Sequence, residues 1–309
     1  MNPLLQIDAL VASVRQKGPV CIGLDTSPKY VPTAFRVKAV NDENQSDVNA
    51  AHAASVLAYN KALIDATWDV AACFKVQIAY YEALGLAGLH TYAETLKYLH
   101  AQKALVIADV KRGDIADTAM QYTRAHFSGD FEADFVTLNP YMGMDSLNPW
   151  LAAAEETGKG AFVLMRTSNP GAADFEYLLT ANDATHVCVD HANSLSLYQV
   201  VGDRLAELAD KYQGESGFGI FGAVVGCTAN DEAAEIRERY PQLFFLIPGY
   251  GAQGGGAETA AILLGKGILK EACGGVVNAS RSIICAGSPE AAREAAIKMR
   301  DNIQAAING

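Results

Sequence analysis

The sequence has little positive charge and no apolar run long enough for a membrane span. It carries 24 lysine and arginine residues against 35 aspartate and glutamate residues, which gives a formal net charge of -11 at pH 7. Nonspecific binding to nucleic acid or to an anionic membrane requires a cationic surface. The uncharged stretch from Ser216 to Asn230 has about fifteen residues, against the ~20 that cross a bilayer. We therefore expect no nucleic-acid partner and no membrane partner.

Cysteine is scarce as well, and no two cysteines are spaced as a CxxC pair. The six cysteines are scattered, most of them in apolar runs such as those around Cys21 and Cys73. This pattern is typical of buried free thiols in a reducing compartment, not of disulfides or a zinc site. The six histidines show no metal-ligand spacing, and the first twenty residues contain no signal-like apolar core. The sequence predicts a cytoplasmic protein without a metal site or an organic cofactor.

The hydrophobic residues, which make up 50% of the chain, indicate a large buried core. Short β-branched runs alternate with polar turns and helical patterns, as in a parallel sheet covered by helices. The runs are almost continuously apolar, which is typical of strands buried on both faces. Eight such units predict an α/β fold, a closed parallel (β/α)8 TIM barrel. The predicted strands are Val20–Asp25, Ala72–Val76, Ala104–Lys111, Asp134–Asn139, Ala161–Arg166, Gly222–Gly226, Leu243–Pro248 and Gly275–Asn278.

Two connections are longer than a minimal barrel needs. They run from Thr26 to Asp69 after the first strand and from Thr167 to Phe221 after the fifth. Neither is flanked by a linker or shows a second set of strands, so we interpret both as insertions. The sequence thus predicts one barrel domain over residues 1–309. Near its end, Ser288-Pro289-Glu290 predicts the start of a helix, since serine caps a helix and proline suits its first turn.

Charged residues end the third predicted strand, in Val106-Ile-Ala-Asp109-Val-Lys111-Arg-Gly-Asp114. Side chains two residues apart on a strand share a face, so Asp109 and Lys111 should point together into the C-terminal mouth of the barrel, where such enzymes place their active sites. Asp114 falls in the following loop or in a first helical turn. Thr118, four residues further, would then share its helix face. A solvated charge run is the alternative, but Asp109 is embedded in the strand.

A lysine also lies in the preceding predicted strand, in the apolar setting Cys73-Phe74-Lys75-Val76. A lysine is rarely buried without a partner, and neighbouring parallel strands would put Lys75 beside Asp109. An alternating array of Lys75, Asp109, Lys111 and Asp114 is nearly neutral, so it can be buried and still direct one carboxylate and one ammonium at a ligand. A purely structural ion-pair network remains the alternative.

Two segments late in the chain have the features of an anion site. The glycines of Pro248-Gly-Tyr-Gly-Ala-Gln253-Gly-Gly-Gly256 can present backbone N–H groups to a phosphate. Arg281 follows the eighth predicted strand, and its planar guanidinium suits a phosphate. Barrels often bind phosphate after strands seven and eight. The same loop formally contains GxGxxG, the motif of dinucleotide-binding oxidoreductases, but only one strand follows it, and Glu271 precedes that strand instead of ending it.

In combination these motifs resemble the orotidine 5'-phosphate decarboxylase family, in particular its second, longer bacterial subfamily. The resemblance runs in order from the first strand to the eighth and covers nearly the whole barrel. The matching segments are Gly23-Leu-Asp25, Phe74-Lys75-Val-Gln77-Ile, Asp109-Val-Lys-Arg-Gly-Asp114-Ile, Asn139-Pro-Tyr-Met-Gly, Arg166-Thr-Ser-Asn-Pro-Gly171, Ile247-Pro-Gly-Tyr-Gly-Ala-Gln-Gly-Gly255 and Asn278-Ala-Ser-Arg281-Ser.

The resemblance implies a carboxy-lyase that converts orotidine 5'-phosphate to uridine 5'-phosphate, the last step of de novo pyrimidine nucleotide synthesis, without metal or organic cofactor. It implies that Lys111 protonates C6 of the pyrimidine, with Lys75, Asp109 and Asp114 completing the charged array. It also implies a homodimer with shared active sites, in which Asp114 and Thr118 serve the partner subunit. The remaining implied substrate contacts are Asp25 and Lys75 at the ribose, Ser168 and Gln253 near the pyrimidine, Pro248 in the substrate pocket, and Arg281 at the phosphate.

A sister group, the sugar-phosphate decarboxylases and hexulose-phosphate synthases, shares the DxKxxD motif and is the nearest enzymatic alternative. Those enzymes typically have a glutamate where Lys75 stands, and they use magnesium. A cation at this position complements no metal ion, so Lys75 favours the orotidine 5'-phosphate decarboxylases. A catalytically silent barrel is a third hypothesis, but it has no need of a buried charged array that costs desolvation free energy.

Overall fold

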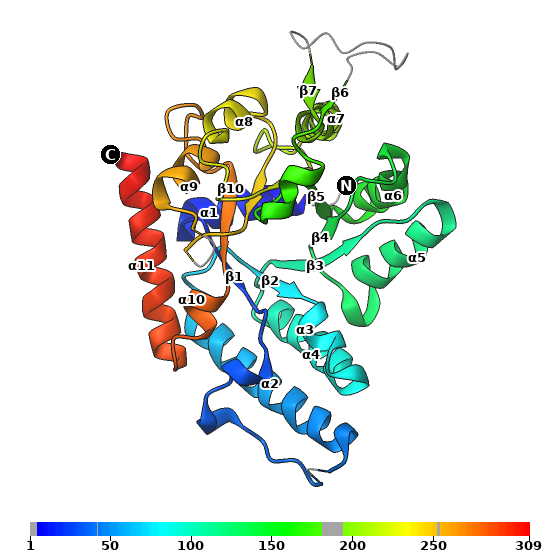
Figure 1. Cartoon of the computed structure of the whole chain (residues 1–309), viewed down its shortest axis with the longest axis vertical. Coiled ribbons are helices and arrows are strands. Elements are labelled where there is room, and N and C mark those ends of the chain that lie inside the picture. The colour runs from blue at the N-terminus through cyan, green and yellow to red at the C-terminus, as the bar shows by residue number, and fades with distance from the viewer. Residues whose placement is uncertain (1–4, 42, 181–193, 252–253) are drawn as a thin grey trace.

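In the computed structural model, residues 5–41, 43–180, 194–251 and 254–309 are described. Strands in this part of the chain close into a barrel in the order β1-β10-β9-β8-β5-β4-β3-β2, and every neighbouring pair is parallel (Figure 1). The predicted (β/α)8 barrel is confirmed. The barrel strands are β1 Val20–Gly23, β2 Cys73–Gln77, β3 Val106–Arg112, β4 Phe135–Leu138, β5 Gly160–Arg166, β8 Phe221–Val225, β9 Phe245–Ile247 and β10 Gly275–Ala279.

Each barrel strand coincides with a predicted apolar run to within one or two residues at either end. Nearly all of their residues are buried, because side chains on one face fill the barrel and those on the other pack under the helices. The exceptions lie in the C-terminal halves of the strands: Gln77 of β2, Lys111 and Arg112 of β3, and Leu164 of β5. The strand ends that carry polar residues therefore meet at one mouth of the barrel.

Helices cover the outside of the barrel (Figure 1). The α-helices are α1 Gln6–Lys17, α2 Gln45–Thr67, α3 Ala79–Glu82, α4 Gly85–Ala101, α5 Ala116–Phe127, α6 Asn148–Thr157, α7 Leu197–Lys211, α8 Ala233–Arg239, α9 Ala257–Leu264, α10 Arg281–Ile284 and α11 Pro289–Asn308. Short 3-10 helices are η1 Pro28–Tyr30, η2 Thr33–Phe35, η3 Gly129–Phe131, η4 Met144–Leu147 and η5 Pro170–Asp174. The predicted cap of α11 is confirmed, since Ser288 Oγ accepts from Ala291 N at 3.2 Å and Pro289 opens the helix.

The two long connections differ in structure. The first holds η1, η2 and the helix α2, which packs against α4 and α11. The second holds η5, a short antiparallel hairpin of β6 (Leu179–Thr180) with β7 (Leu195–Ser196), and α7. The expectation that this insertion has no strands of its own was wrong, because two-residue strands are too short to leave an alternating pattern in the sequence. Figure 1 shows the hairpin projecting from the barrel.

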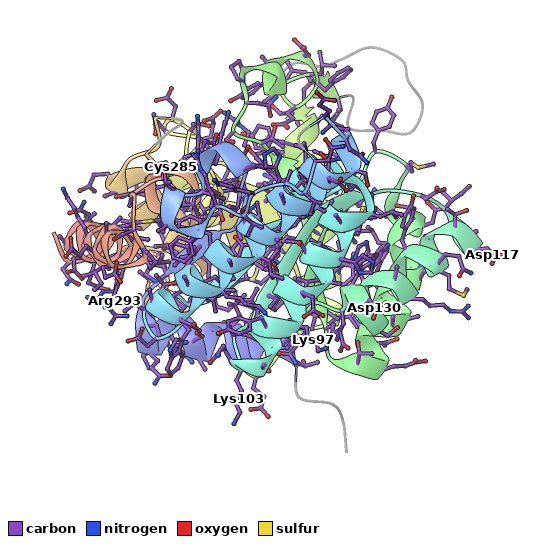
Figure 2. All side chains as sticks on the ribbon, turned by 90° about the horizontal axis from the view of Figure 1, so that it is seen from below. Lys97, Lys103, Asp117, Asp130, Cys285 and Arg293 are labelled. Carbon is purple, nitrogen blue, oxygen red and sulfur yellow. The ribbon has the colours of Figure 1, made fainter. Side chains whose placement is uncertain are left out.

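The cysteines in the described part of the chain are all free. Cys21, Cys73, Cys227 and Cys273 are buried as predicted, whereas Cys285 is exposed at the surface (Figure 2). Cys188 lies outside the described residues. Among the helices described, none combines the length and the apolar character that crossing a bilayer demands.

His126, in the last turn of α5, is a buried titratable group behind β3. Its side chain is 1% exposed, and Arg112 Nε donates to its Nε2 at 3.5 Å. Burial, and then the neighbouring Arg112 guanidinium, lower the pKa of His126 from 6.5 to about 4. The folded protein therefore holds this imidazole neutral under conditions where the unfolded chain protonates it.

This depressed pKa predicts a loss of stability in mild acid. Above pH 6.5 the imidazole is neutral in both the folded and the unfolded protein, and folding loses nothing by keeping it so. As the pH falls from 6.5 toward about 4, only the unfolded chain takes up the proton, and the free energy of unfolding falls by about 3 kcal/mol. Urea unfolding at a series of pH values should show a shallower pH dependence for His126→Gln than for the wild type in this window. Identical slopes would contradict the assignment.

Candidate active site

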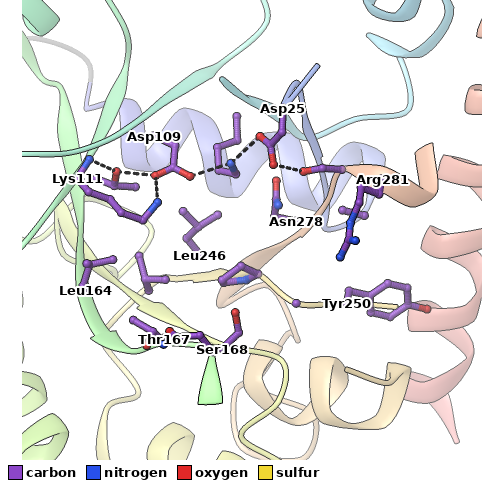
Figure 3. A pocket seen from close by; sticks show the side chains of 18 of the residues that line it. Asp25, Asp109, Lys111, Leu164, Thr167, Ser168, Leu246, Tyr250, Asn278 and Arg281 are labelled. Carbon is purple, nitrogen blue, oxygen red and sulfur yellow. Dashed lines mark hydrogen bonds and ion pairs between the residues drawn. The ribbon is translucent and has the colours of Figure 1, made fainter. Parts of the chain in front are cut away.

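The C-terminal mouth of the barrel encloses a cavity of about 550 Å³ (Figure 3). Its walls come from the ends of the barrel strands and from the loops that follow them, so residues distant in the sequence meet there. The polar side chains in the lining are Asp25, Tyr30, Lys75, Tyr80, Asp109, Lys111, Thr137, Thr167, Ser168, Asn169, Tyr250, Asn278, Ser280, Arg281 and Ser282. Apolar contacts come from Leu164, Val224, Leu246 and Pro248.

Lysine and aspartate side chains alternate along one wall of this cavity. Lys75 Nζ lies 3.1 Å from Asp25 Oδ1 and 2.8 Å from Asp109 Oδ2, and Lys111 Nζ lies 2.6 Å from Asp109 Oδ1 (Figure 3). The side chains of Lys75 and Asp109 are 5% and 9% exposed, whereas that of Lys111 is 48% exposed. The array thus runs from a buried centre to an ammonium group that faces the open cavity.

The register of the strands explains why these groups meet. Lys75 of β2 pairs with Gly23 of β1, two residues before Asp25, and Gln77 of β2 pairs with Asp109 of β3. Asp25 and Asp109 therefore each lie two residues beyond the partner of Lys75 on the neighbouring strand, within reach of the long lysine side chain. The sequence-based expectation that Lys75 lies beside Asp109 agrees with these contacts.

The pKa values of the buried pair follow from burial opposed by mutual attraction. Burial by itself lowers the pKa of Lys75, but the carboxylates of Asp109 and Asp25 outweigh it and raise that pKa above its usual value. Burial raises the pKa of Asp109, but Lys75 and Lys111 outweigh it and hold that pKa below its usual range. Both groups are therefore charged at neutral pH.

Thr137 of β4 supports the array and was missed by sequence reasoning. Its hydroxyl donates to Asp109 Oδ1 at 2.9 Å and accepts from the backbone N–H groups of Val110 and Lys111, each at 2.9 Å. Lys111 has a φ of +44°, and the register between β3 and β4 shifts at this point. One hydroxyl group therefore fixes both the Asp109 carboxylate and the irregular backbone that carries Lys111.

Ser280 plays a similar part at the other end of the array and was also missed. Its Oγ donates to Asp25 Oδ2 at 2.7 Å. Gly23 lies against it so closely that a Cβ at this position would sit 2.0 Å from Ser280 Oγ. The glycine before Asp25 is therefore required by the approach of β10. A serine in a turn gives no such signal in the sequence.

Three of the predicted substrate contacts also line the cavity. Ser168 lies in the loop after β5, Pro248 follows β9, and Arg281 is the first residue of α10. In Figure 3 the side chains of Thr167 and Ser168 lie across the cavity from Asp25 and Asp109. Gln253 lies outside the described residues.

Asp114 and Thr118 do not line the cavity of their own chain. Asp114 stands in the loop before α5, where its Oδ1 accepts from Ile115 N at 2.8 Å. Because α5 begins only at Ala116, the two residues do not share a helix face, and the argument from helical spacing was wrong. Thr118 is exposed on α5. A single chain thus brings together Asp25, Lys75, Asp109 and Lys111, and leaves these two residues on its surface.

The topology removes the dinucleotide-binding alternative. The glycine loop joins β9 to α9, and β10 after it closes the barrel against β1, so there is no open doubly wound sheet with a switch point. Gly249 and Gly251 have φ values of +95° and +72°, and Gly255 N donates to Gly249 O at 3.1 Å.

Within the described ranges, no group of three or more histidine, cysteine, aspartate or glutamate residues could hold a metal ion.

Comparison with known proteins agrees with the fold and with the motifs. A model of the orotidine 5'-phosphate decarboxylase / HUMPS family matches residues 18–296. The chain is 50% identical over 308 residues to the orotidine 5'-phosphate decarboxylase of Clostridium perfringens, covering 97% of this chain and 98% of that protein.

Solved structures show the same barrel. The chain is similar to the Leishmania donovani OMP decarboxylase, with a TM-score of 0.72 and 28% identity over 100% of both chains. It is also similar to a putative orotidine 5'-phosphate decarboxylase from Streptomyces avermitilis, with a TM-score of 0.76 and 29% identity over 100% of this chain and 98% of that one.

The barrel and the charged cavity at its mouth define an α/β-barrel enzyme. The chain belongs to the orotidine 5'-phosphate decarboxylase / HUMPS family, and within it to the orotidine 5'-phosphate decarboxylases, which are carboxy-lyases.

The buried centre of the array makes a prediction for stability. Lys75→Met leaves two carboxylates facing each other without the central ammonium, so the free energy of unfolding at pH 7 should fall by about 3 kcal/mol. The loss should shrink toward pH 4, where protonation removes the repulsion. Denaturant unfolding measures both values. Lys97→Met is the matched control, because Lys97 is 79% exposed on α4 (Figure 2), and an equal effect of the two substitutions would refute the prediction.

Proposed function

We propose that this chain converts orotidine 5'-phosphate to uridine 5'-phosphate and CO2, the last step of de novo pyrimidine nucleotide synthesis, without metal or organic cofactor. The observation that carries the proposal is the alternating array of Asp25, Lys75, Asp109 and Lys111 at the mouth of the cavity. The names of the relatives, from Clostridium perfringens and Leishmania donovani among others, support it.

Lys111 is the proposed proton donor. When the bond between C6 and the carboxylate breaks, its electron pair stays on C6 in the plane of the ring, where no conjugated group can accept it. The ammonium of Lys111 stabilises this charge and then transfers a proton to C6. Its side chain is 48% exposed, so the resulting amine can recover a proton from solvent. Lys75 and Asp109 orient the ammonium throughout.

Asp109 contributes by repulsion, but only in part. A substrate carboxylate held about 4 Å from Asp109 at an effective dielectric constant of ~20 is repelled by roughly 4 kcal/mol, and the repulsion disappears as CO2 leaves. This corresponds to about three powers of ten in rate, less than the ~8 kcal/mol at the low end of enzymatic acceleration. We assign the larger share to the preorganised Lys111 and to binding free energy from the remote phosphate.

The remaining contacts position the substrate. Asp25 and Lys75 hold the ribose hydroxyls, and Arg281 binds the phosphate beside the glycine loop. Ser168, Pro248 and Gln253 contact the pyrimidine side of the substrate. This assignment is supported by the lining of the cavity, which includes Asp25, Lys75, Arg281, Ser168 and Pro248. An acidic protein can bind an anionic substrate only at a site with local positive charge. Lys75, Lys111 and Arg281 supply that charge in the cavity.

The donor set of the array supports chemistry without a metal ion. Asp109 Oδ2 accepts from Lys75, and Asp109 Oδ1 accepts from Lys111 and Thr137. Asp25 Oδ1 accepts from Lys75, and Asp25 Oδ2 accepts from Ser280. All four carboxylate oxygens are engaged, and an ammonium stands between the two carboxylates. A magnesium ion would have to displace that ammonium, which distinguishes this site from the magnesium-dependent sister group.

We further propose that the enzyme is a homodimer with shared active sites, to which Asp114 and Thr118 contribute across the interface. Apolar side chains are exposed on the loops after β3 and β4 and on α5: Ile115, Met120, Tyr141 and Met142 are between 40% and 85% exposed. The two loops are in contact, since Asn139 N donates to Arg112 O at 2.8 Å. Residues 1–309 would form one barrel domain in each subunit. The free thiols support a cytoplasmic location.

Removing the proton donor should abolish turnover without abolishing binding. The wild type, incubated with orotidine 5'-phosphate and EDTA, should show the ultraviolet change that accompanies decarboxylation. Lys111→Ala should be slower by at least about four powers of ten, because both the proton and the charge that stabilises C6 are lost. Uridine 5'-phosphate should still bind, as calorimetry can show. Activity lost on chelation and restored by magnesium would disprove the cofactor-free proposal, and near-normal turnover would exclude Lys111 as the donor.

Shared sites can be tested by complementation. Asp114→Ala and Lys111→Ala proteins should each be inactive alone. Mixed after unfolding and refolding together, they should recover about a quarter of wild-type activity, because half of the dimers are mixed and each holds one complete site. Mass spectrometry under native conditions verifies the mixed dimers. No recovery in verified mixed dimers would show that each subunit uses its own Asp114.

A further inference from the structure

Glu176 lies in the long insertion after β5 and contacts the loop that lines the cavity. Its Oε2 accepts from the backbone N–H of Thr167 at 2.9 Å, and its Oε1 accepts from the Thr167 hydroxyl at 2.6 Å. The same hydroxyl lies 2.7 Å from Asn169 Oδ1. Thr167, Ser168 and Asn169 all line the cavity. One carboxylate therefore holds both the backbone and the side chain at the start of this three-residue segment.

The backbone of Glu176 is itself well anchored. Its N–H donates to Ala172 O at 2.8 Å, and its carbonyl accepts from Tyr198 N, at the start of α7, at 3.0 Å. The hairpin β6/β7 begins three residues further on, at Leu179, and leads into α7. The carboxylate is consequently presented from a fixed segment, not from a free loop.

Tyr177, the next residue, ties the same segment to the barrel. The guanidinium of Arg166, the last residue of β5, lies 5.0 Å from the centre of the Tyr177 ring and 3.6 Å from the Glu232 carboxylate. The Tyr177 hydroxyl donates to Glu232 as well. Arg166 is 6% exposed, so a buried guanidinium at the end of β5 connects the insertion to the strand that leads into Thr167.

The opposite side of the segment is closely packed too. A Cβ at Gly226 of the β8 end would sit 2.8 Å from Ser168 Cα, and Thr228 Oγ1 lies 3.4 Å from Ser168 O. Ser168 is thus held between the end of β8 and the residue that Glu176 fixes. Without the Glu176 carboxylate, Ser168 would be held only by the packing against the end of β8.

We propose that Glu176 is a positioning residue that sets the conformation of Thr167–Asn169 and thereby the affinity of the site for the pyrimidine ring. The inference rests on the proposed function, in which Ser168 faces the pyrimidine. Glu176 is not among the residues that line the cavity, so it acts through Thr167. The insertion after β5 would then complete the substrate pocket instead of merely lengthening the loop.

The test compares two ligands that differ in the pyrimidine. Uridine 5'-phosphate contacts both sides of the cavity, whereas ribose 5-phosphate lacks the base. In Glu176→Ala the Kd for uridine 5'-phosphate should rise about tenfold, since two hydrogen bonds that fix the loop are lost, and the KM for orotidine 5'-phosphate should rise similarly. The Kd for ribose 5-phosphate should stay within about twofold of the wild-type value. Calorimetric titration measures both.

Two conservative variants separate hydrogen bonding from charge, and they also serve if Glu176→Ala does not fold. Glu176→Gln can accept from Thr167 N and donate to Thr167 Oγ1, so it should bind uridine 5'-phosphate within about twofold of wild type. Glu176→Asp keeps the charge but is shorter by one methylene, so it should lose affinity. The matched control is Glu207→Ala on α7, an exposed glutamate of the same insertion that pairs with Arg204.

The outcomes are distinct. Equal weakening of both ligands, an unchanged Kd for uridine 5'-phosphate in Glu176→Ala, or a Glu176→Gln variant that binds no better than Glu176→Asp would each overturn the inference. A wild-type protein that neither binds uridine 5'-phosphate more tightly than ribose 5-phosphate nor turns over orotidine 5'-phosphate would refute the proposed function itself.

Discussion

The burial of two carboxylates around one ammonium is the interaction on which the rest of the structure depends. Removing Asp109 and Lys75 from water costs free energy that a single ion pair barely recovers, so each charged atom must find partners on several sides. Lys75 meets Asp25 and Asp109, and the far oxygens of those carboxylates meet Ser280 in one case and Lys111 with Thr137 in the other. The chain of contacts spans β1 to β4 and β10. Its members cannot move independently, and this is the preorganisation that the proposed charge stabilisation at C6 requires.

A closed barrel is well suited to such an array. Parallel strands place their C-terminal ends at one mouth, so one residue per strand suffices to build a continuous polar wall. Buried strand interiors below the mouth, such as Phe135 and Phe162 in ring contact at 5.3 Å, keep water from the underside of the charges. The open side of Lys111 is then where the array presents an exposed charge to the cavity. The apolar core thus determines which of the charged groups remains available for chemistry.

Much of the barrel and the centre of the array could be predicted from the sequence, because both depend on short-range periodicity. Continuous apolar runs mark strands buried on two faces, and a spacing of two residues puts Asp109 and Lys111 on one face. The supporting roles of Thr137, Ser280 and Glu176 could not be predicted from the sequence. Each acts through a hydrogen bond to a residue that is near in space but belongs to another element, and nothing in its local pattern distinguishes it from any other polar residue. Asp114 lies in the loop, one of the two places that the sequence allowed, so only the predicted helix face shared with Thr118 was wrong.

The two sides of the cavity are built by different means, and the difference matches the proposed division of work. The charged wall is made of strand residues held by ion pairs, where an error of 1 Å in Lys111 would misdirect the proposed proton transfer. The facing wall includes loop residues: Thr167–Asn169, which Glu176 of the insertion holds through Thr167, and Pro248–Tyr250 after β9. The proposed recognition of the pyrimidine is thereby assigned to a segment whose position depends on an insertion. A barrel of this kind can change what it binds by altering the insertion, while the array proposed to break the carbon–carbon bond stays fixed in the strands.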